Sequence, residues 1–102
     1  MRLHDFELDA SYYTDPLFLK WPHDKRAFYL SLLAVANDEM LVRDDMFDLK
    51  LLAWPSPLDA DMTVELFEKW RDEMIESGVL KPYMIDGKRY LEIRYVPGGA
   101  SR

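Results

Sequence analysis

Histidine is the first residue type to consider for catalysis, and the 102-residue chain contains only two, His4 and His23. Neither has a serine or a carboxylate at a spacing typical of a catalytic group. Cysteine is absent, which excludes disulfides and thiolate metal sites and is typical of proteins from a reducing cytosol. We therefore expect no catalytic residue and no enzymatic activity.

Paired carboxylates could hold a metal ion, because hard cations bind several oxygen ligands at once. Three such pairs occur: Asp38-Glu39, Asp44-Asp45 and Asp59-x-Asp61. A calcium-binding loop needs ligands at alternate positions, a glycine at the bend and a distal glutamate, and no pair has this pattern. Helix caps and solvated loops explain the acidic pairs, so we expect no metal, no cofactor and no small-molecule substrate.

Basic residues that could contact nucleic acid gather near the C-terminal end of an acidic chain. Thirteen Lys and Arg against nineteen Asp and Glu give a formal net charge of −6, which opposes unspecific binding to DNA or to anionic membranes. Residues 79–102, in contrast, contain five basic and two acidic side chains. We predict contacts to DNA phosphates from one set of residues: Lys69, Arg71, Lys81, Lys88, Arg89 and Arg94.

Lys88 and Arg89 directly follow the pair Asp86-Gly87, which predicts the tight turn of a β-hairpin. The tip of such a hairpin can reach phosphates or a minor groove. Basic residues on an exposed hairpin also prevent edge-to-edge aggregation of sheets, and the sequence leaves both interpretations open.

Hydrophobic spacing and capping residues predict the elements that position these side chains. We expect a helix over residues 23–38 capped by Asp24, with a buried stripe that Tyr29 and Leu33 widen. A second helix should follow Asp44 or Asp45 and end before Pro55, and residues 55–61 form a loop. The longest helix should start at Asp61 or Thr63 and run to Ser77. Its predicted buried face is Leu66, Phe67, Trp70 and Met74.

Three strands are expected around these helices. One is a strand of about three residues within residues 40–45, and two longer ones, residues 79–84 and 89–96, flank the turn. Gly78 occupies the position where a left-handed residue ends a helix. The order helix, strand, helix, helix, strand, strand predicts an α+β fold of the winged helix-turn-helix type.

The segment before this core is assigned more simply. Residues 2–10 form a short strand or an extended arm, and a short helix follows Thr14 with Pro16 in its first turn. We divide a single domain of residues 1–102 into an arm with this short helix (1–22), a helical core (23–78), the hairpin or wing (79–96) and a tail (97–102). No apolar run is long enough for a signal peptide or a membrane span, so a cytoplasmic protein is expected.

The longest helix should carry the residues that contact bases if the domain recognises DNA through the major groove. Its exposed side instead contains Glu65, Glu68, Asp72, Glu73 and Glu76 beside Lys69 and Arg71. Carboxylates repel phosphates, which makes major-groove recognition by this helix unfavourable. Six Met, three Trp and six Tyr are many for a small domain, and they belong either to the core or to an apolar patch that binds a partner.

Several motifs resemble those of DnaD-type replication initiation proteins and phage replisome organisers. The opening matches at Asp15, Phe18, Leu19, Ala27, Leu32, Leu33, Ala36, Asn37 and Asp38. The segment ESGVLKPYMIDGKRYLEI is similar to the wing of that family at Gly78, Val79, Leu80, Tyr83, Asp86, Gly87, Tyr90, Leu91 and Ile93. Met40 stands where the turn of the family usually carries glycine.

The resemblance implies a non-catalytic winged-helix domain of the bacterial or phage DNA replication machinery. We expect it to act in protein assembly, with a replisome protein or with itself as a homo-oligomer, and to contact DNA backbone weakly through the wing. The alternative is a sequence-specific transcriptional regulator of the winged-helix type. The two hypotheses differ in whether the wing and the longest helix form one continuous positive face.

Overall fold

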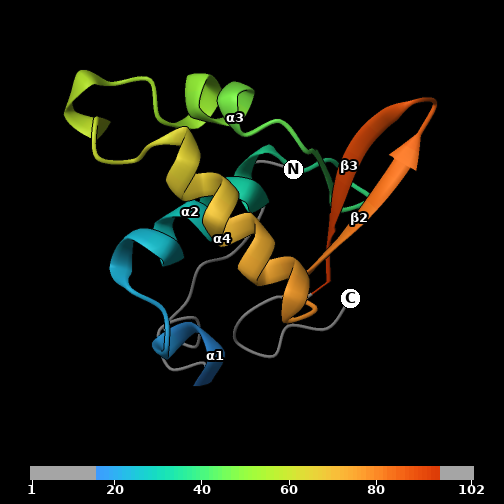
Figure 1. Cartoon of the computed structure of the whole chain (residues 1–102), viewed down its shortest axis with the longest axis horizontal. Helices are drawn as coiled ribbons and strands as arrows, with labels where there is room; N and C mark the ends of the chain where they lie inside the picture. Colours follow the sequence, from blue (N-terminus) through green and yellow to red (C-terminus); the bar gives the residue numbers. More distant parts are fainter. Residues whose placement is uncertain (1–15, 95–102) are drawn as a thin grey trace.

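The computed structural model describes residues 16–94, which fold into helices and a small sheet in mixed order (Figure 1). The expected N-terminal strand or arm, the Thr14 cap, the tail and His4 lie outside the described residues. In chain order the elements are α1 Pro16–Leu19, α2 His23–Val35, β1 Leu41–Arg43, α3 Met46–Ala53, the 3₁₀ helix η3 Pro57–Asp59, α4 Val64–Glu76, β2 Leu80–Ile85 and β3 Lys88–Ile93.

Local capping chemistry fixes where α3 and α4 begin. The Asp45 side chain accepts a hydrogen bond from the Asp48 amide, and the Thr63 hydroxyl accepts one from the Leu66 amide. These contacts decide between the two predicted caps at each helix. The predicted Asp24 cap is wrong, because α2 already begins at His23 after Pro22, which makes no side-chain cap hydrogen bond. Asp24 lies in the first turn, where its negative charge interacts favourably with the positive end of the helix dipole.

The core is aromatic where α2 crosses α4. Phe28 lies 4.9 Å from Phe67 and 5.6 Å from Trp70, measured between ring centroids, and Phe28 and Phe67 are fully buried. Tyr29 and Leu33 are also fully buried, which confirms the wide stripe predicted for α2. Such contacts between tilted rings stabilise the core beyond the burial of their area.

The C-terminal end of α4 turns sharply into the sheet at Gly78. The Gly78 amide donates to the Ile75 carbonyl at 3.1 Å, and the Val79 amide donates to the Met74 carbonyl at 2.9 Å. Gly78 has φ +84°, a conformation that side chains disfavour, so glycine is suited to this position. This motif confirms the predicted end of the helix and directs the chain into β2.

The sheet is antiparallel with strand order β1-β3-β2. Asp86 and Gly87 have φ of +52° and +77°, and Ile85 pairs with Lys88, so the predicted two-residue turn is confirmed. Pro82 lies in β2, which is an edge strand with no neighbour on its outer side. Proline is tolerated there because it has no amide hydrogen to donate to a further strand. β2 begins and ends one residue later than the predicted range 79–84. β3 begins one residue before the predicted range 89–96 and ends at Ile93, and residues 95–96 of that range lie outside the described residues.

Helices and sheet together form an α+β, winged-helix-like arrangement. The base of the hairpin is buried against the helices through Leu80, Leu91 and Ile93, whereas the rest of β2 is exposed. In Figure 1 the hairpin extends away from the helices as a free ribbon. The predicted loop over residues 55–61 contains a short 3₁₀ helix, which the Ser56 hydroxyl caps.

Candidate functional site

The two basic residues at the hairpin tip lie on opposite faces of the sheet. Successive side chains of a strand alternate between faces, and directly paired residues share one face. Lys88 pairs with Ile85, and Arg89 pairs with Met84. Lys88 therefore belongs to the face of Tyr90, and Arg89 belongs to the face whose base is buried.

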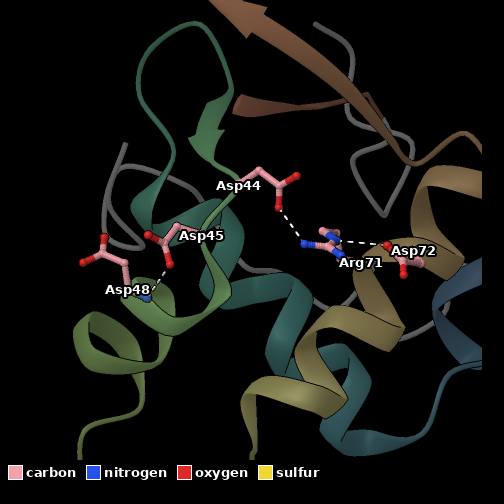
Figure 2. A network of polar contacts seen from close by, with 5 residues as sticks. All are labelled: Asp44, Asp45, Asp48, Arg71 and Asp72. Carbon is pink, nitrogen blue, oxygen red and sulfur yellow. Dashed lines mark hydrogen bonds and ion pairs between the residues drawn. The ribbon is translucent and has the colours of Figure 1, made fainter. Parts of the chain in front are cut away.

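Arg71 forms ion pairs with two carboxylates of the protein, Asp44 and Asp72 (Figure 2). Its Nη1 lies 2.9 Å from Oδ1 of Asp44, and its Nε lies 3.0 Å from Oδ1 of Asp72. Only 18% of the Arg71 side chain and 10% of the Asp44 side chain are exposed. Burial lowers the pKa of Arg71, but hydrogen bonds and charges from Asp72 and Asp44 outweigh this effect and raise the pKa above the usual value of an arginine.

Lys69 lies on the exposed side of α4 among carboxylates. Oε1 of Glu73 accepts a 2.8 Å hydrogen bond from Nζ of Lys25 in α2, and the two side chains form an ion pair. This hydrogen bond, and then the charges of Lys25 and Lys69, lower the pKa of Glu73 below 4.5 against a smaller opposing effect of burial. The exposed side of α4 thus keeps the acidic character that its sequence predicts, and the charge of Arg71 is neutralised within it.

A hollow of about 410 Å³ separates the hairpin tip from α3 and α4. The positively charged residues that line it are Arg43, Arg71, Lys88 and Arg89, and the negatively charged ones are Asp44, Asp45 and Glu68. Because Arg71 is already paired, the two signs nearly cancel. The wing and α4 do not form one continuous positive face.

The acidic pair Asp44-Asp45 has a structural role. Asp44 binds Arg71, and Asp45 caps α3. Within residues 16–94, no group of three or more histidines and carboxylates is placed to hold a metal ion.

A basic surface lies on the face of the sheet that carries Tyr90, which we call the outer sheet face, and it contains both predicted and unpredicted residues. Lys81, Lys88 and Arg94, all predicted, lie there with Arg43 of β1, which the sequence analysis missed. Two tyrosines, Tyr83 and Tyr90, lie directly opposite each other between these cations. The alternation along each strand and the turn at Asp86-Gly87 are sufficient to place Tyr83, Tyr90 and Lys88 together. Arg43 requires the pairing of β1 with β3, which no local pattern specifies.

Three large apolar residues of α3 are exposed to solvent. We call Phe47, Leu51 and Leu52 the α3 surface; their exposed fractions are 63%, 58% and 64%. An apolar hollow of about 310 Å³ beside Phe47 and Leu51 is lined further by Trp54, Pro55, Pro57 and Ala60. Trp70 and Met74 belong to the core instead, so the exposed patch consists mainly of leucine and phenylalanine.

No known family model, curated protein or solved structure matches the chain. This winged-helix-like domain presents three distinct surfaces to potential partners: the acidic exposed side of α4, the outer sheet face and the α3 surface. No helix within residues 16–94 has the length and apolar character needed to span a membrane.

Proposed function

We propose that this chain is a non-catalytic domain of bacterial or phage DNA replication machinery, which assembles with protein partners through the α3 surface. The observation that carries the proposal is the exposure of Phe47, Leu51 and Leu52 on one short helix. Large apolar side chains are each stabilised by roughly 1.5–3 kcal/mol when they are fully removed from water. Burial against a partner would recover part of this energy. The replication context rests on the resemblance of the motifs to DnaD-type proteins and replisome organisers.

The partner is a second copy of the chain or a replisome protein, and a weaker contact to nucleic-acid backbone is made through the wing. A regulator that recognises a DNA sequence through α4 is the less favoured function. Glu65, Glu68 and Asp72 on the exposed side of α4 repel phosphates, and Arg71 is held by Asp44.

Sedimentation velocity over a wide range of concentrations tests self-association. We expect the wild-type chain to self-associate and the double variant Leu51→Glu/Leu52→Glu to be monomeric. Met84→Glu is the matched control, because Met84 is 64% exposed but lies on the wing. All three positions are exposed, so these substitutions should change stability little.

A photo-crosslinking residue at position 51 tests the second class of partner, with purified replisome proteins as candidates. A specific crosslink from position 51, absent from position 84, supports the proposal. A strictly monomeric chain that crosslinks to none of these proteins would refute it.

A further inference from the structure

The outer sheet face is basic on a chain of formal charge −6. Arg43, Lys81, Lys88 and Arg94 are all exposed. Glu92 is the one carboxylate that the described strands place on this face, and it lies 3.7 Å from Arg94, measured between Oε1 and Nη1. A surface with four cations and one carboxylate attracts polyanions locally, whatever the charge of the whole chain.

Two aromatic rings lie in the middle of this basic face. Tyr83 is 40% exposed, and Tyr90, its direct partner across the strands, is half-buried. The Nζ of Lys81 lies 5.3 Å from the centre of the Tyr83 ring, and the Cζ of Arg43 lies 5.6 Å from the centre of the Tyr90 ring. A charged group of a molecule that stacks on either ring would therefore lie close to a cation.

A cross-strand tyrosine pair stabilises a hairpin by itself, and basic residues protect its edge from aggregation. Those roles explain a pair of rings or a scatter of lysines. They do not explain why the cations gather on the tyrosine face while Arg89 and Met84 occupy the other face near the tip. Alternating rings and cations instead match the chemistry of a nucleic-acid strand, in which flat bases alternate with phosphates.

We propose that the outer sheet face binds single-stranded nucleic acid, stacking unpaired bases on Tyr83 and Tyr90 and pairing phosphates with the four surrounding cations. A base that stacks on Tyr83 displaces the Lys81 ammonium, which then reaches the neighbouring phosphate. Exposed cation–π contacts are weak, so this exchange costs little. The inference rests on the nucleic-acid part of the proposed function and is independent of the α3 surface.

A single strand fits this surface better than a duplex. The base faces of a duplex are covered by their neighbours, so the tyrosines would have nothing to stack on. A duplex placed against the wing would also approach the acidic exposed side of α4, where Glu68 lines the hollow beside Lys88. The strand segment from the pair Lys81/Glu92 to the pair Ile85/Lys88 covers about 13 Å, enough for a few nucleotides.

Fluorescence anisotropy with labelled 12-nucleotide pyrimidine strands at low salt tests the proposal on the whole chain. Deoxyribose and ribose strands distinguish DNA from RNA as the source of the strand, and binding of either one supports the inference. We expect the duplex of the same sequence and an abasic strand of the same charge to bind at least several-fold more weakly. Polyglutamate serves as the acidic-peptide comparison and should not compete.

Substitution of the rings tests stacking directly. Tyr83→Ala should lower the affinity about 5- to 150-fold, the range seen when a stacking ring is removed. Tyr83→Phe keeps the ring and should keep most of the affinity, as should Tyr90→Phe. Met84→Ala is the matched control, because Met84 is the next residue along β2 and lies on the opposite face. Circular dichroism of each variant reports whether the hairpin is still folded.

Charge reversal provides a second matched pair. Lys88→Glu should weaken binding severalfold more than Arg89→Glu, because only Lys88 shares a face with the tyrosines. Three outcomes would overturn the inference: no binding of either strand by the wild type at low salt, equal binding of single strand and abasic strand, or equal loss in the Lys88 and Arg89 variants. None of these outcomes changes the sedimentation of the α3 variants, so the two proposals fail separately.

Discussion

Asp44 and Arg71 are 27 positions apart in the sequence and form a 2.9 Å ion pair between the β1–α3 connection and the middle of α4 (Figure 2). Both side chains are largely buried, and Arg71 is held on a second side by Asp72. The pair connects the entry of α3 to the helix that carries much of the aromatic core. An arginine expected to contact DNA is thereby used to fix the position of two elements.

Arg71→Met is expected to destabilise the fold by about 1–3 kcal/mol, because it leaves the poorly solvated carboxylate of Asp44 without its partner. Urea denaturation measures the loss. Asp72→Asn is the control, since the Asp72 side chain is 66% exposed and exposed pairs contribute little. In a double-mutant cycle, Asp44→Asn should cost less in the Arg71→Met background than in the wild type. Additive losses would show that the two residues act independently.

Met40 adopts a conformation that glycine would favour, with φ +62°, although only 1% of its surface is exposed. Met40→Gly relieves roughly 1–2 kcal/mol of backbone strain but removes a buried side chain worth about 2–5 kcal/mol. The lost packing is larger, so we expect net destabilisation of about 1–3 kcal/mol in thermal or urea unfolding. Asp86→Gly is the matched control at an exposed site with φ +52° and should change stability little. A stabilised Met40→Gly variant would contradict this prediction.

Hydrogen bonds to Asn37 hold the turn that contains Met40. The Asn37 side chain accepts hydrogen bonds from the amides of Glu39 and Leu41, and the Met40 amide donates to the Asn37 carbonyl. These bonds hold a turn with left-handed backbone at position 40. Met40 thus holds a left-handed position of the kind that usually favours glycine.

Gly87 is the second residue of the hairpin turn, at φ +77°, and a Cβ added there would meet no atom within 4 Å. Gly87→Ala should therefore cost only the backbone conformation, about 1–2 kcal/mol. Gly87→Asn should cost less, because asparagine tolerates this region. Chemical denaturation compares the two variants. Equal losses would indicate that a clash, and not the backbone, determines the cost.

Elements governed by neighbouring residues were predictable from the sequence. The Asp-Gly turn, the cap of α4 and the Gly78 helix end each depend on contacts within five residues. The turn and the helix end are confirmed, and of the two predicted caps, Asp61 and Thr63, Thr63 is the one that the structure shows. Asp24 failed as a cap because Pro22 precedes the helix in extended conformation, and proline suits the start of a helix without a side-chain cap.

Surface properties depend on tertiary contacts and were predicted less well. The α3 sequence MFDLKLLA is apolar on nearly all sides, and only Met46 and Leu49 are buried among its residues. Nothing local distinguishes them from Phe47 or Leu51. Arg71 is neutralised mainly by Asp44, which belongs to another part of the chain. The residues next to Arg71 in the sequence do not reveal this partner, so Arg71 was predicted to be free to contact DNA. The separation of Lys88 from Arg89, in contrast, follows from strand alternation once the turn is placed.

Glu73 provides a prediction on pH, because its ion pair with Lys25 lowers the pKa of the carboxyl below 4.5. A depressed pKa in the folded state means that the pair stabilises the fold above pH 4.5. The stabilisation is lost as the pH falls through the folded-state pKa. The Glu73 side chain is 43% exposed, so solvent screening limits its effect to a few tenths of a kcal/mol.

The measurement for Glu73 is the difference in unfolding free energy between the wild type and Glu73→Gln at neutral pH and near pH 3. The difference should be present at neutral pH and should shrink in acid. Glu76→Gln is the control, because Glu76 is exposed on the same helix and makes no ion pair within the described residues. A difference that grows in acid would reverse the assigned sign.

The number of phosphates that the outer sheet face contacts sets the salt dependence of its binding to a single strand. Each contact with single-stranded nucleic acid lowers log affinity by about 0.7 per tenfold rise in salt. Four cations, Arg43, Lys81, Lys88 and Arg94, therefore allow a slope no steeper than about −3. Lys88→Glu should make the slope shallower by about 0.7 or more, whereas Arg89→Glu should leave it unchanged, because Arg89 lies on the other face. Anisotropy titrations over a series of salt concentrations give these slopes. A wild-type slope well beyond −3 would mean that cations outside the outer sheet face bind the strand.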